Sequence, residues 1–303
     1  MIARRLPLFG TGAAWRVGLA ALAILLALLI ARLPLPLAGV LVVGAAAVLL
    51  TLVQPLVGLG LALLLGPWGA LQNVALGPTL LDTGQLALLL TLAVWLASCL
   101  ARRRLVVPST PLNVPWLLFV LVALVSLLDA PSVGLGLVEL VKWLQMGLVV
   151  WLVVDVAHNG AHNGAHAPIG PAAVARVLLA LLLLAGLSQA LIGIWQFGLR
   201  NDGPEHFIIL ERFYRAYGTF EQPNPFGGYI SLTALLALGV TMGLLADLRG
   251  LRRPLRSWMW PVFVAFCAAA ATLALVFSWS RGAWLGFRSE ERRVGKECRS
   301  RWS

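Results

Sequence analysis

Charged residues are scarce in this sequence. Asp, Glu, Lys and Arg make up only 12% of its 303 residues, whereas 60% are hydrophobic and the mean hydropathy is +0.90. Soluble domains carry about 25% charged residues. The composition therefore excludes a soluble globular protein and is typical of a polytopic membrane protein.

Acidic residues are the scarcer kind of charge. The sequence has 12 acidic and 23 basic residues, which gives a formal net charge of +11. Such a charge would suit nucleic acid, but most of the basic residues stand in short clusters between apolar runs, where they set the orientation of a membrane protein. We therefore expect membrane lipids as partners and no nucleic acid.

Cysteine and familiar catalytic motifs are also lacking. Cys99 and Cys267 lie in apolar runs and Cys298 lies in a charged tail, so neither a disulfide framework nor a metal-ligand spacing is indicated. The sequence contains no H-E-x-x-H motif, no phosphate-binding glycine loop with lysine, no serine nucleophile elbow and no carboxylate pair at glycosidase spacing. No metal or other cofactor is expected.

What the sequence has instead is a series of apolar runs long enough to cross a bilayer. They predict an all-α polytopic membrane protein with about nine spans. These are expected at about 17–31, 37–53, 55–67, 83–100, 112–128, 134–156, 174–197, 225–246 and 258–279. The second and third spans, separated by Gln54-Pro55, form either a tight hairpin or a broken pair. The first is expected to be retained, because Arg32-Leu33-Pro34 offers no small-residue site for signal-peptide cleavage.

Polar residues occur near the ends of two of these spans. Asp82 is predicted to cap the fourth helix, with Gln85 completing a capping box; a catalytic role is the alternative for Asp82. Glu139 and Lys142 are three residues apart and therefore share one face of the sixth helix. Charge at membrane depth is costly unless it is paired or faces a cavity. The two residues predict either an ion pair within the helix near the interface or a pair that faces a substrate cavity.

A tandem AHNG repeat places His158, His162 and His166 four residues apart. On a helix this spacing would bind a metal. The two Asn-Gly pairs and the Pro- and Gly-rich stretch after them favour a flexible loop instead. We interpret the segment as a loop that arose from the repeat.

The segment 211–229, ERFYRAYGTFEQPNPFGGY, concentrates polar, Arg and aromatic residues in an otherwise apolar chain. Asn224 is predicted as the N-cap of the eighth helix and Pro225 as its first residue. A helix N-terminus exposes unpaired N–H groups and a partial positive charge. Together with nearby Arg side chains it would form an anion site suited to phosphate.

Two short motifs carry a family resemblance. They are Arg215-x-x-Gly218-Thr219-Phe220-x-x-Pro223-Asn224-x-Phe226-Gly227 and, a helical hairpin later, Ser280-Arg281-Gly282-Ala283-Trp284. In this order and spacing they resemble the O-antigen ligase and O-antigen polymerase superfamily, although Gly227 stands where such proteins more often carry alanine. The resemblance, supported by hydropathy, covers a membrane domain at 1–287 with an external loop at 198–225.

The resemblance implies a metal-independent glycosyltransferase of the bacterial inner membrane, active in lipopolysaccharide or other cell-surface polysaccharide biosynthesis. A glycan would leave its polyprenyl-diphosphate carrier on the extracytoplasmic face and join a hydroxyl of a glycan or lipid acceptor. Arg215 and Arg281 would be catalytic, because they would stabilise the departing diphosphate. The implied substrate-binding residues are Arg212, Tyr217, Gly218, Thr219, Asn224 and Ser280. The alternatives are a solvated loop charge for Arg215 and an interfacial, snorkelling side chain for Arg281.

The distribution of basic residues predicts a cytoplasmic N-terminus and an extracytoplasmic active face. With nine crossings, eleven basic residues fall inside and five outside, as the positive-inside rule requires. Those inside are Arg4, Arg5, Arg16, Arg102, Arg103, Arg104, Arg176, Arg249, Arg252, Arg253 and Arg256. Those outside are Arg32, Arg200, Arg212, Arg215 and Arg281.

The last segment, 288–303, differs from the rest, because nine of its sixteen residues are charged. We expect it to be a non-native tail on a chain truncated relative to the family, with the acceptor-activating base in the part beyond. A different functional class is a multi-pass transporter or flippase for a lipid-linked or anionic substrate. That class predicts two related halves with helices interrupted by Gly or Pro, and the sequence shows no such internal repeat.

Overall fold

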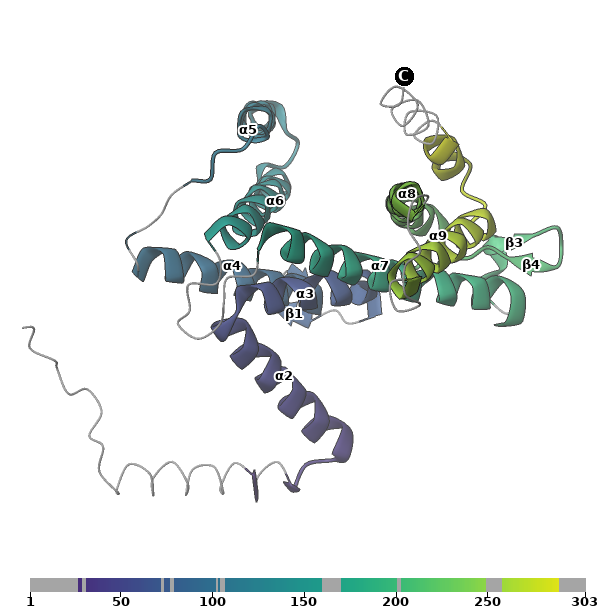
Figure 1. Cartoon of the computed structure of the whole chain (residues 1–303), viewed down its shortest axis with the longest axis horizontal. Helices are drawn as coiled ribbons and strands as arrows, with labels where there is room; N and C mark the ends of the chain where they lie inside the picture. Colours follow the sequence, from purple (N-terminus) through teal and green to yellow (C-terminus); the bar gives the residue numbers. More distant parts are fainter. Residues whose placement is uncertain are drawn as a thin grey trace, which may run out of the picture. The chain divides into compact units, whose positions relative to one another are not determined.

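The computed structural model describes residues 27–28, 31–71, 74–76, 79–101, 103, 107–159, 170–200, 203–248 and 258–288 (Figure 1). The chain divides into two units, Met1–Leu50 and Thr51–Ser303. In the first unit the main described element is helix α2 (Leu35–Val53), whose last residues belong to the second unit. The second unit holds the other elements whose bounds are given below, and the candidate site.

Six helices in the described part of the chain are long and apolar enough to cross a membrane. They are α2, α4 (Thr83–Ala101), α6 (Val133–Asn159), α7 (Pro171–Trp195), α8 (Pro223–Leu248) and α9 (Met259–Phe277). The helices α3 (Pro55–Leu65) and α5 (Asn113–Ser126) are apolar but shorter. The predicted class, an all-α membrane protein, is confirmed. The predicted number of nine spans is not, because two fall on α3 and α5 and most of the span at 17–31 lies outside the described residues.

Turn chemistry sets the boundaries around α3 and α4. Gln54 is extended, and α3 begins at Pro55, which has no N–H to continue the preceding helix. After α3 come the 3-10 helix η1 (Gly66–Leu71) and the antiparallel hairpin of β1 (Val74–Leu76) and β2 (Thr79–Leu81). The backbone N–H of Gln85 donates to Asp82 Oδ1 at 2.7 Å, so Asp82 caps α4 as predicted.

The helices α7, α8 and α9 pack closely because small residues line their contacts. One buried cluster is built largely from alanine, including Ala190 of α7, Ala234 of α8 and Ala271 of α9, with Phe226 and Ile230 beside them. Small residues let helix backbones approach where lipid supplies no hydrophobic driving force. Figure 1 shows α8 and α9 side by side, next to the C-terminal half of α7.

The segment between α7 and α8 is more structured than the loop predicted at 198–225. It contains the π-helix η3 (Gln196–Arg200), the 3-10 helix η4 (Glu205–Phe207) and an antiparallel pair of two-residue strands, β3 (Ile208–Ile209) and β4 (Phe213–Tyr214). Phe197 stacks between Phe213 and Phe277, with ring centroids 5.1 Å and 4.1 Å away. These aromatic contacts hold the β3–β4 hairpin against the end of α9.

The predicted start of α8 was wrong by two residues. The helix already begins at Pro223, because the N–H of Phe226 donates to the carbonyl of Gln222 at 3.4 Å. Both Pro223 and Pro225 suit the first turn of a helix, and the earlier one takes the first position. Asn224 therefore lies inside the first turn and does not cap it.

Candidate functional site

Arg215 lies directly after β4 and reaches the turn that follows α9. Its Nε donates to the carbonyl of Ser278 at 3.0 Å, and its Nη2 donates to the carbonyl of Trp279 at 3.2 Å and to Asn224 Oδ1 at 3.1 Å. The carbonyls at a helix C-terminus lack partners within the helix and carry a partial negative charge. Arg215 thus caps α9. Three of its five side-chain N–H groups donate to protein acceptors, and the two N–H groups on Nη1 are left without one.

The turn that receives Arg215 has an uncommon backbone conformation. Trp279 has a φ of 51°, in the left-handed region that glycine normally occupies after a helix. For a non-glycine residue this costs on the order of 1 kcal/mol. The Trp279 ring lies 5.9 Å from the ring of Trp284, and Trp284 Nε1 donates to the carbonyl of Leu275 at 2.8 Å. These contacts, with the bonds from Arg215, hold the strained turn in place.

Arg281 is the second cation of the site. It is exposed and begins a helix at 281–288 directly after the turn. Burial lowers the pKa of Arg215, and the charge of Arg281 lowers that pKa further. The ion pair found in the described part of the chain is Lys142 with Glu139, so no described carboxylate lies within salt-bridge distance of either arginine. The two guanidinium groups therefore form a local excess of positive charge.

The helix at 281–288 adds backbone donors beside this charge. The N–H of Trp284 donates to the carbonyl of Ser280 at 3.0 Å, so the N–H groups of Arg281, Gly282 and Ala283 have no partner within the helix. The predicted contribution from the start of α8 is smaller, because prolines at 223 and 225 leave one N–H group, that of residue 224, among its first three residues. The helix start with three N–H groups that have no partner within the helix therefore lies at Arg281.

Ser280, predicted to bind substrate, is buried in the contact between this turn and α8. A Cβ atom added to Gly227 would lie 2.8 Å from Ser280 Cβ and 3.1 Å from Ser278 Oγ. Gly227 therefore allows the start of α8 to approach the turn. The glycine that stands where the resembled family more often has alanine is fitted to this close contact.

Gly218 and Thr219, also predicted to bind substrate, are buried and held by two glutamines of the π-helix and α7. Gln196 Oε1 accepts from the N–H groups of Tyr217 and Gly218 at 3.1 Å and 2.7 Å, and its Nε2 donates to the carbonyl of Gly218 at 2.8 Å. Gln189 Oε1 accepts from the N–H of Thr219 at 3.1 Å. Gly218 has a φ of 56°, which glycine adopts without strain. Both residues therefore help to shape the segment, and their predicted role in substrate binding stays a prediction.

Sequence analysis missed Gln189 and Gln196, although the sequence carries a signal for them. They are the two glutamines in the last part of a long apolar run, and their spacing of seven residues places them on one face of a helix. A buried amide on an apolar helix needs a hydrogen-bonding partner. The backbone of the neighbouring polar segment pairs with both side-chain polar atoms of Gln196 and with Oε1 of Gln189. Gln189 Nε2 is buried and has no partner in the described part of the chain.

Thr219 also connects this segment to the first half of the chain. Its Oγ1 donates to the carbonyl of Pro67 in η1. The start of α4 packs on the same 3-10 helix, because a Cβ atom added to Gly84 would lie 2.7 Å from Gly66 Cα. The end of α3, the start of α4 and segment 215–219 therefore meet at one end of the helices.

The remaining predicted residues lie around the hairpin. The Tyr217 ring is 5.4 Å from Phe207, and its hydroxyl is 3.5 Å from Arg200 Nη1. Arg212 is exposed, with its guanidinium 5.4 Å from the centre of the Phe213 ring. Both have local aromatic contacts, whereas Arg215, Asn224 and Arg281 come together at the turn after α9.

The histidine repeat falls mostly outside the described residues. The backbone of α6 extends to Asn159 and so includes the position of His158, whereas His162 and His166 are not described. Among described residues no group of three His, Cys, Asp or Glu side chains is placed to hold a metal ion. The choice between loop and metal site stays a sequence-based prediction.

Comparison with known proteins adds no family assignment. No protein-family model matches the chain, and neither the curated proteins nor the solved structures searched contain a match.

Proposed function

We propose that this protein transfers a glycan from a polyprenyl-diphosphate carrier to an acceptor hydroxyl on the extracytoplasmic face of a bacterial inner membrane. The observation that supports this most is the juxtaposition of Arg215 and Arg281, which is close enough for one charge to lower the pKa of the other. No described carboxylate neutralises the pair. Two guanidinium groups beside a helix N-terminus suit an anion with more than one charge, such as a diphosphate.

The arrangement fits the chemistry of a departing diphosphate. In the transfer, the acceptor oxygen bonds to the anomeric carbon as the bond from that carbon to the diphosphate breaks, and the electron pair leaves with the diphosphate. The acceptor proton passes to a base. Arg281, the Nη1 group of Arg215 and the first N–H groups of helix 281–288 would meet the negative charge that develops. Each such donor is worth on the order of 3 kcal/mol in the transition state.

Two lines of support bear on the proposed orientation. The segments expected on the extracytoplasmic side meet one another: Thr219 bonds to Pro67, and Arg215 bonds to Ser278. The distribution of basic residues favours the opposite ends as cytoplasmic. Together they support a proposal in which the arginine pair faces the side where a carrier-linked glycan is presented after translocation.

A binding measurement tests the proposal. The purified 303-residue chain in detergent should bind polyprenyl diphosphate, and Arg281→Ala should weaken this binding about ten- to a hundredfold, because charge-assisted hydrogen bonds are lost. Arg176→Ala is the matched control, since Arg176 is exposed on α7 and its Nε bonds to the carbonyl of Ala172. Unchanged binding by Arg281→Ala would remove the arginine pair from the proposal.

A second measurement separates the transferase from the transporter. Membrane vesicles that contain the protein are given a lipid-linked glycan and an acceptor. Formation of glycosylated acceptor with release of polyprenyl diphosphate supports transfer. Movement of the intact lipid-linked glycan across the vesicle membrane without product would favour a transporter instead.

A further inference from the structure

Trp279 presents an exposed ring at the turn that holds Arg215 and Arg281. Its carbonyl accepts from Arg215 Nη2 at 3.2 Å, and Arg281 follows two residues later. The residue is 38% exposed. Its indole N–H donates to no acceptor among the described residues, whereas that of Trp284 donates to the carbonyl of Leu275 at 2.8 Å. An aromatic face and an unused donor therefore lie beside the arginine pair.

Anchoring at the membrane surface does not account for the backbone of Trp279. Its φ of 51° lies in the left-handed region, where glycine is the favoured residue after a helix. Trp258, at the other end of α9, is 40% exposed and has an ordinary φ of −85°. An interfacial tryptophan needs only an exposed ring at the right depth, and Trp258 supplies one without strain. Strained residues cluster where function requires them, so of these two tryptophans Trp279 is the candidate for a binding role.

The ring of Trp279 lies on the side of the turn that carries Arg281. Trp284 comes three residues after Arg281 in helix 281–288, so the two side chains are neighbours on one face of that helix. The rings of Trp279 and Trp284 have centroids 5.9 Å apart and planes inclined at 53°. A sugar joined to a diphosphate at the arginine pair is separated from it by a single ester oxygen, which brings the sugar within reach of this ring.

We propose that Trp279 binds the sugar residue that is attached directly to the diphosphate of the carrier. This inference rests on the function proposed above, because it takes the diphosphate to lie at the arginine pair. The sugar is a pyranose with a flat face of C–H groups, which carry partial positive charge and pack against the negative face of the indole. The indole N–H donates to one of its oxygens. Trp279 thereby selects a carrier that bears a sugar over one that does not.

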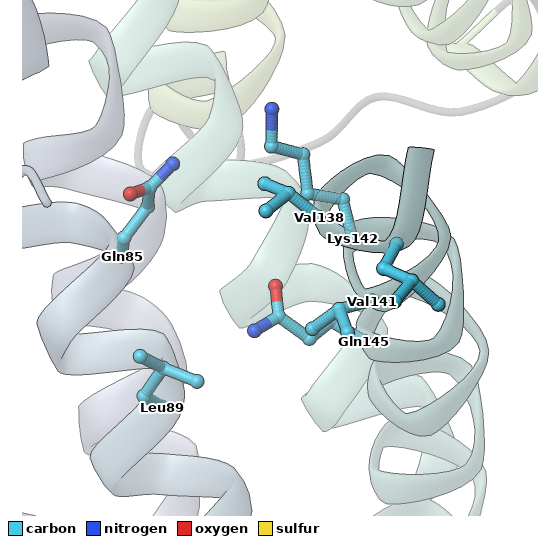
Figure 2. A pocket seen from close by; sticks show the side chains of 7 residues that line it. Gln85, Leu89, Val138, Val141, Lys142 and Gln145 are labelled. Carbon is cyan, nitrogen blue, oxygen red and sulfur yellow. The ribbon is translucent and has the colours of Figure 1, made fainter. Parts of the chain in front are cut away.

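The cavity between α4 and α6 does not offer this chemistry. It has a volume of about 260 Å³, and Figure 2 shows Gln85 on one side and Lys142 with Gln145 on the other. Its cation, Lys142, is already paired with Glu139 at 2.6 Å, which is the ion pair predicted within α6. No aromatic ring is among its described lining residues. The turn after α9 combines unpaired cations with an exposed ring, so the sugar is assigned there.

The first test compares two ligands of equal charge. One is polyprenyl diphosphate esterified with a single glucose, and the other is the same diphosphate esterified with a methyl group. The 303-residue chain in detergent is titrated with each, and bound ligand is measured by native mass spectrometry. The glucose ester should bind about five- to tenfold more tightly, because stacking and one hydrogen bond are added. Equal affinities would overturn this inference and leave the arginine pair in place, whereas no binding of either ester would overturn the proposed function as well.

The second test locates the preference at the ring. Trp279→Gly removes the ring and suits the left-handed turn, so its thermal midpoint should stay within about 2 °C of wild type. It should bind both esters equally. Trp279→Phe keeps an aromatic face without the N–H and should retain a preference of about two- to threefold for glucose.

Trp258→Ala is the matched control, because it removes a similarly exposed ring at the other end of α9; it should keep the full preference for glucose. The readout is a ratio of two affinities within one variant, so a smaller amount of folded protein does not alter it. A full preference retained in Trp279→Gly would refute the assignment. Equal weakening of both esters in that variant would also refute it, since the ring would then contact the prenyl chain or the membrane surface.

Discussion

Replacement of Arg215 by lysine tests most directly how the turn after α9 is held. The guanidinium joins three acceptors on two segments: the carbonyls of Ser278 and Trp279, and Asn224 Oδ1. An ammonium is a single point on a flexible stem and does not span the same acceptors in one geometry. Lysine should therefore keep one of the three bonds at best, and alanine none.

The magnitude follows from these bonds. A hydrogen bond from a charged donor contributes about 1.5–3 kcal/mol when buried, and about 1 kcal/mol is more suitable here because Arg215 is partly exposed and screened by water. Arg215→Ala should then lower the free energy of unfolding by about 3 kcal/mol and Arg215→Lys by about 2 kcal/mol. Thermal unfolding in detergent, followed by circular dichroism, measures both.

Binding of polyprenyl diphosphate should weaken in both variants by about a hundredfold, since the turn that positions Arg281 loosens and the Nη1 donors are lost. Asn224→Asp is the companion variant: it keeps an acceptor for Arg215 and adds a negative charge beside the site. It should preserve thermal stability while weakening diphosphate binding. Wild-type stability and binding in Arg215→Lys would refute both the cap and the anion site.

Three further predictions concern packing, the buried amides and topology. Gly227→Ala should lower the free energy of unfolding by about 1–3 kcal/mol through overpacking, as measured by thermal unfolding, whereas Gly228→Ala, which meets open space, should be nearly neutral. Gln196→Leu removes three hydrogen bonds to a buried backbone and should cost about 3 kcal/mol or more in the same assay; a loss below 1 kcal/mol would contradict that role. Cysteines placed at Arg212 and Arg103 should react with a membrane-impermeant label from opposite sides of the membrane, and reaction of both from one side would refute the topology.

Local signals in the sequence predicted the start of α4 correctly but not the start of α8. The Asp82 cap depends on residues within one turn, and it is confirmed. At α8 two prolines two residues apart were equally acceptable as the first helical residue, so local chemistry did not decide between them. The side chain of Asn224 was predicted to cap α8, but it accepts a hydrogen bond from Arg215, which lies in another segment. Contacts between segments that are distant in the sequence therefore determine the role of Asn224, which the local pattern did not.

The candidate site was predictable in part. The motifs pointed to Arg215 and Arg281 together, and the structure brings them to one turn. The sequence did not show that Arg215 spends most of its donors on the end of α9, because those acceptors are backbone carbonyls, which no side-chain pattern reveals. Gly218 and Thr219 were predicted to bind substrate only through the family resemblance, which did not reveal that the side-chain oxygens of Gln196 and Gln189 accept from their N–H groups.

The bond between Thr219 and Pro67 has a consequence for the order of assembly during synthesis. Its two partners are 152 residues apart, so at about 5–20 residues per second the ribosome delivers the second roughly 8–30 s after the first. During this interval the carbonyl of Pro67 in η1 lacks the hydrogen bond that the hydroxyl of Thr219 donates in the complete protein. The segment around Arg215 reaches its final position late, because that position depends on an earlier helix pair already in the membrane. A slow step in insertion of α3 and α4 should therefore delay the appearance of the arginine site, although neither arginine lies in those helices.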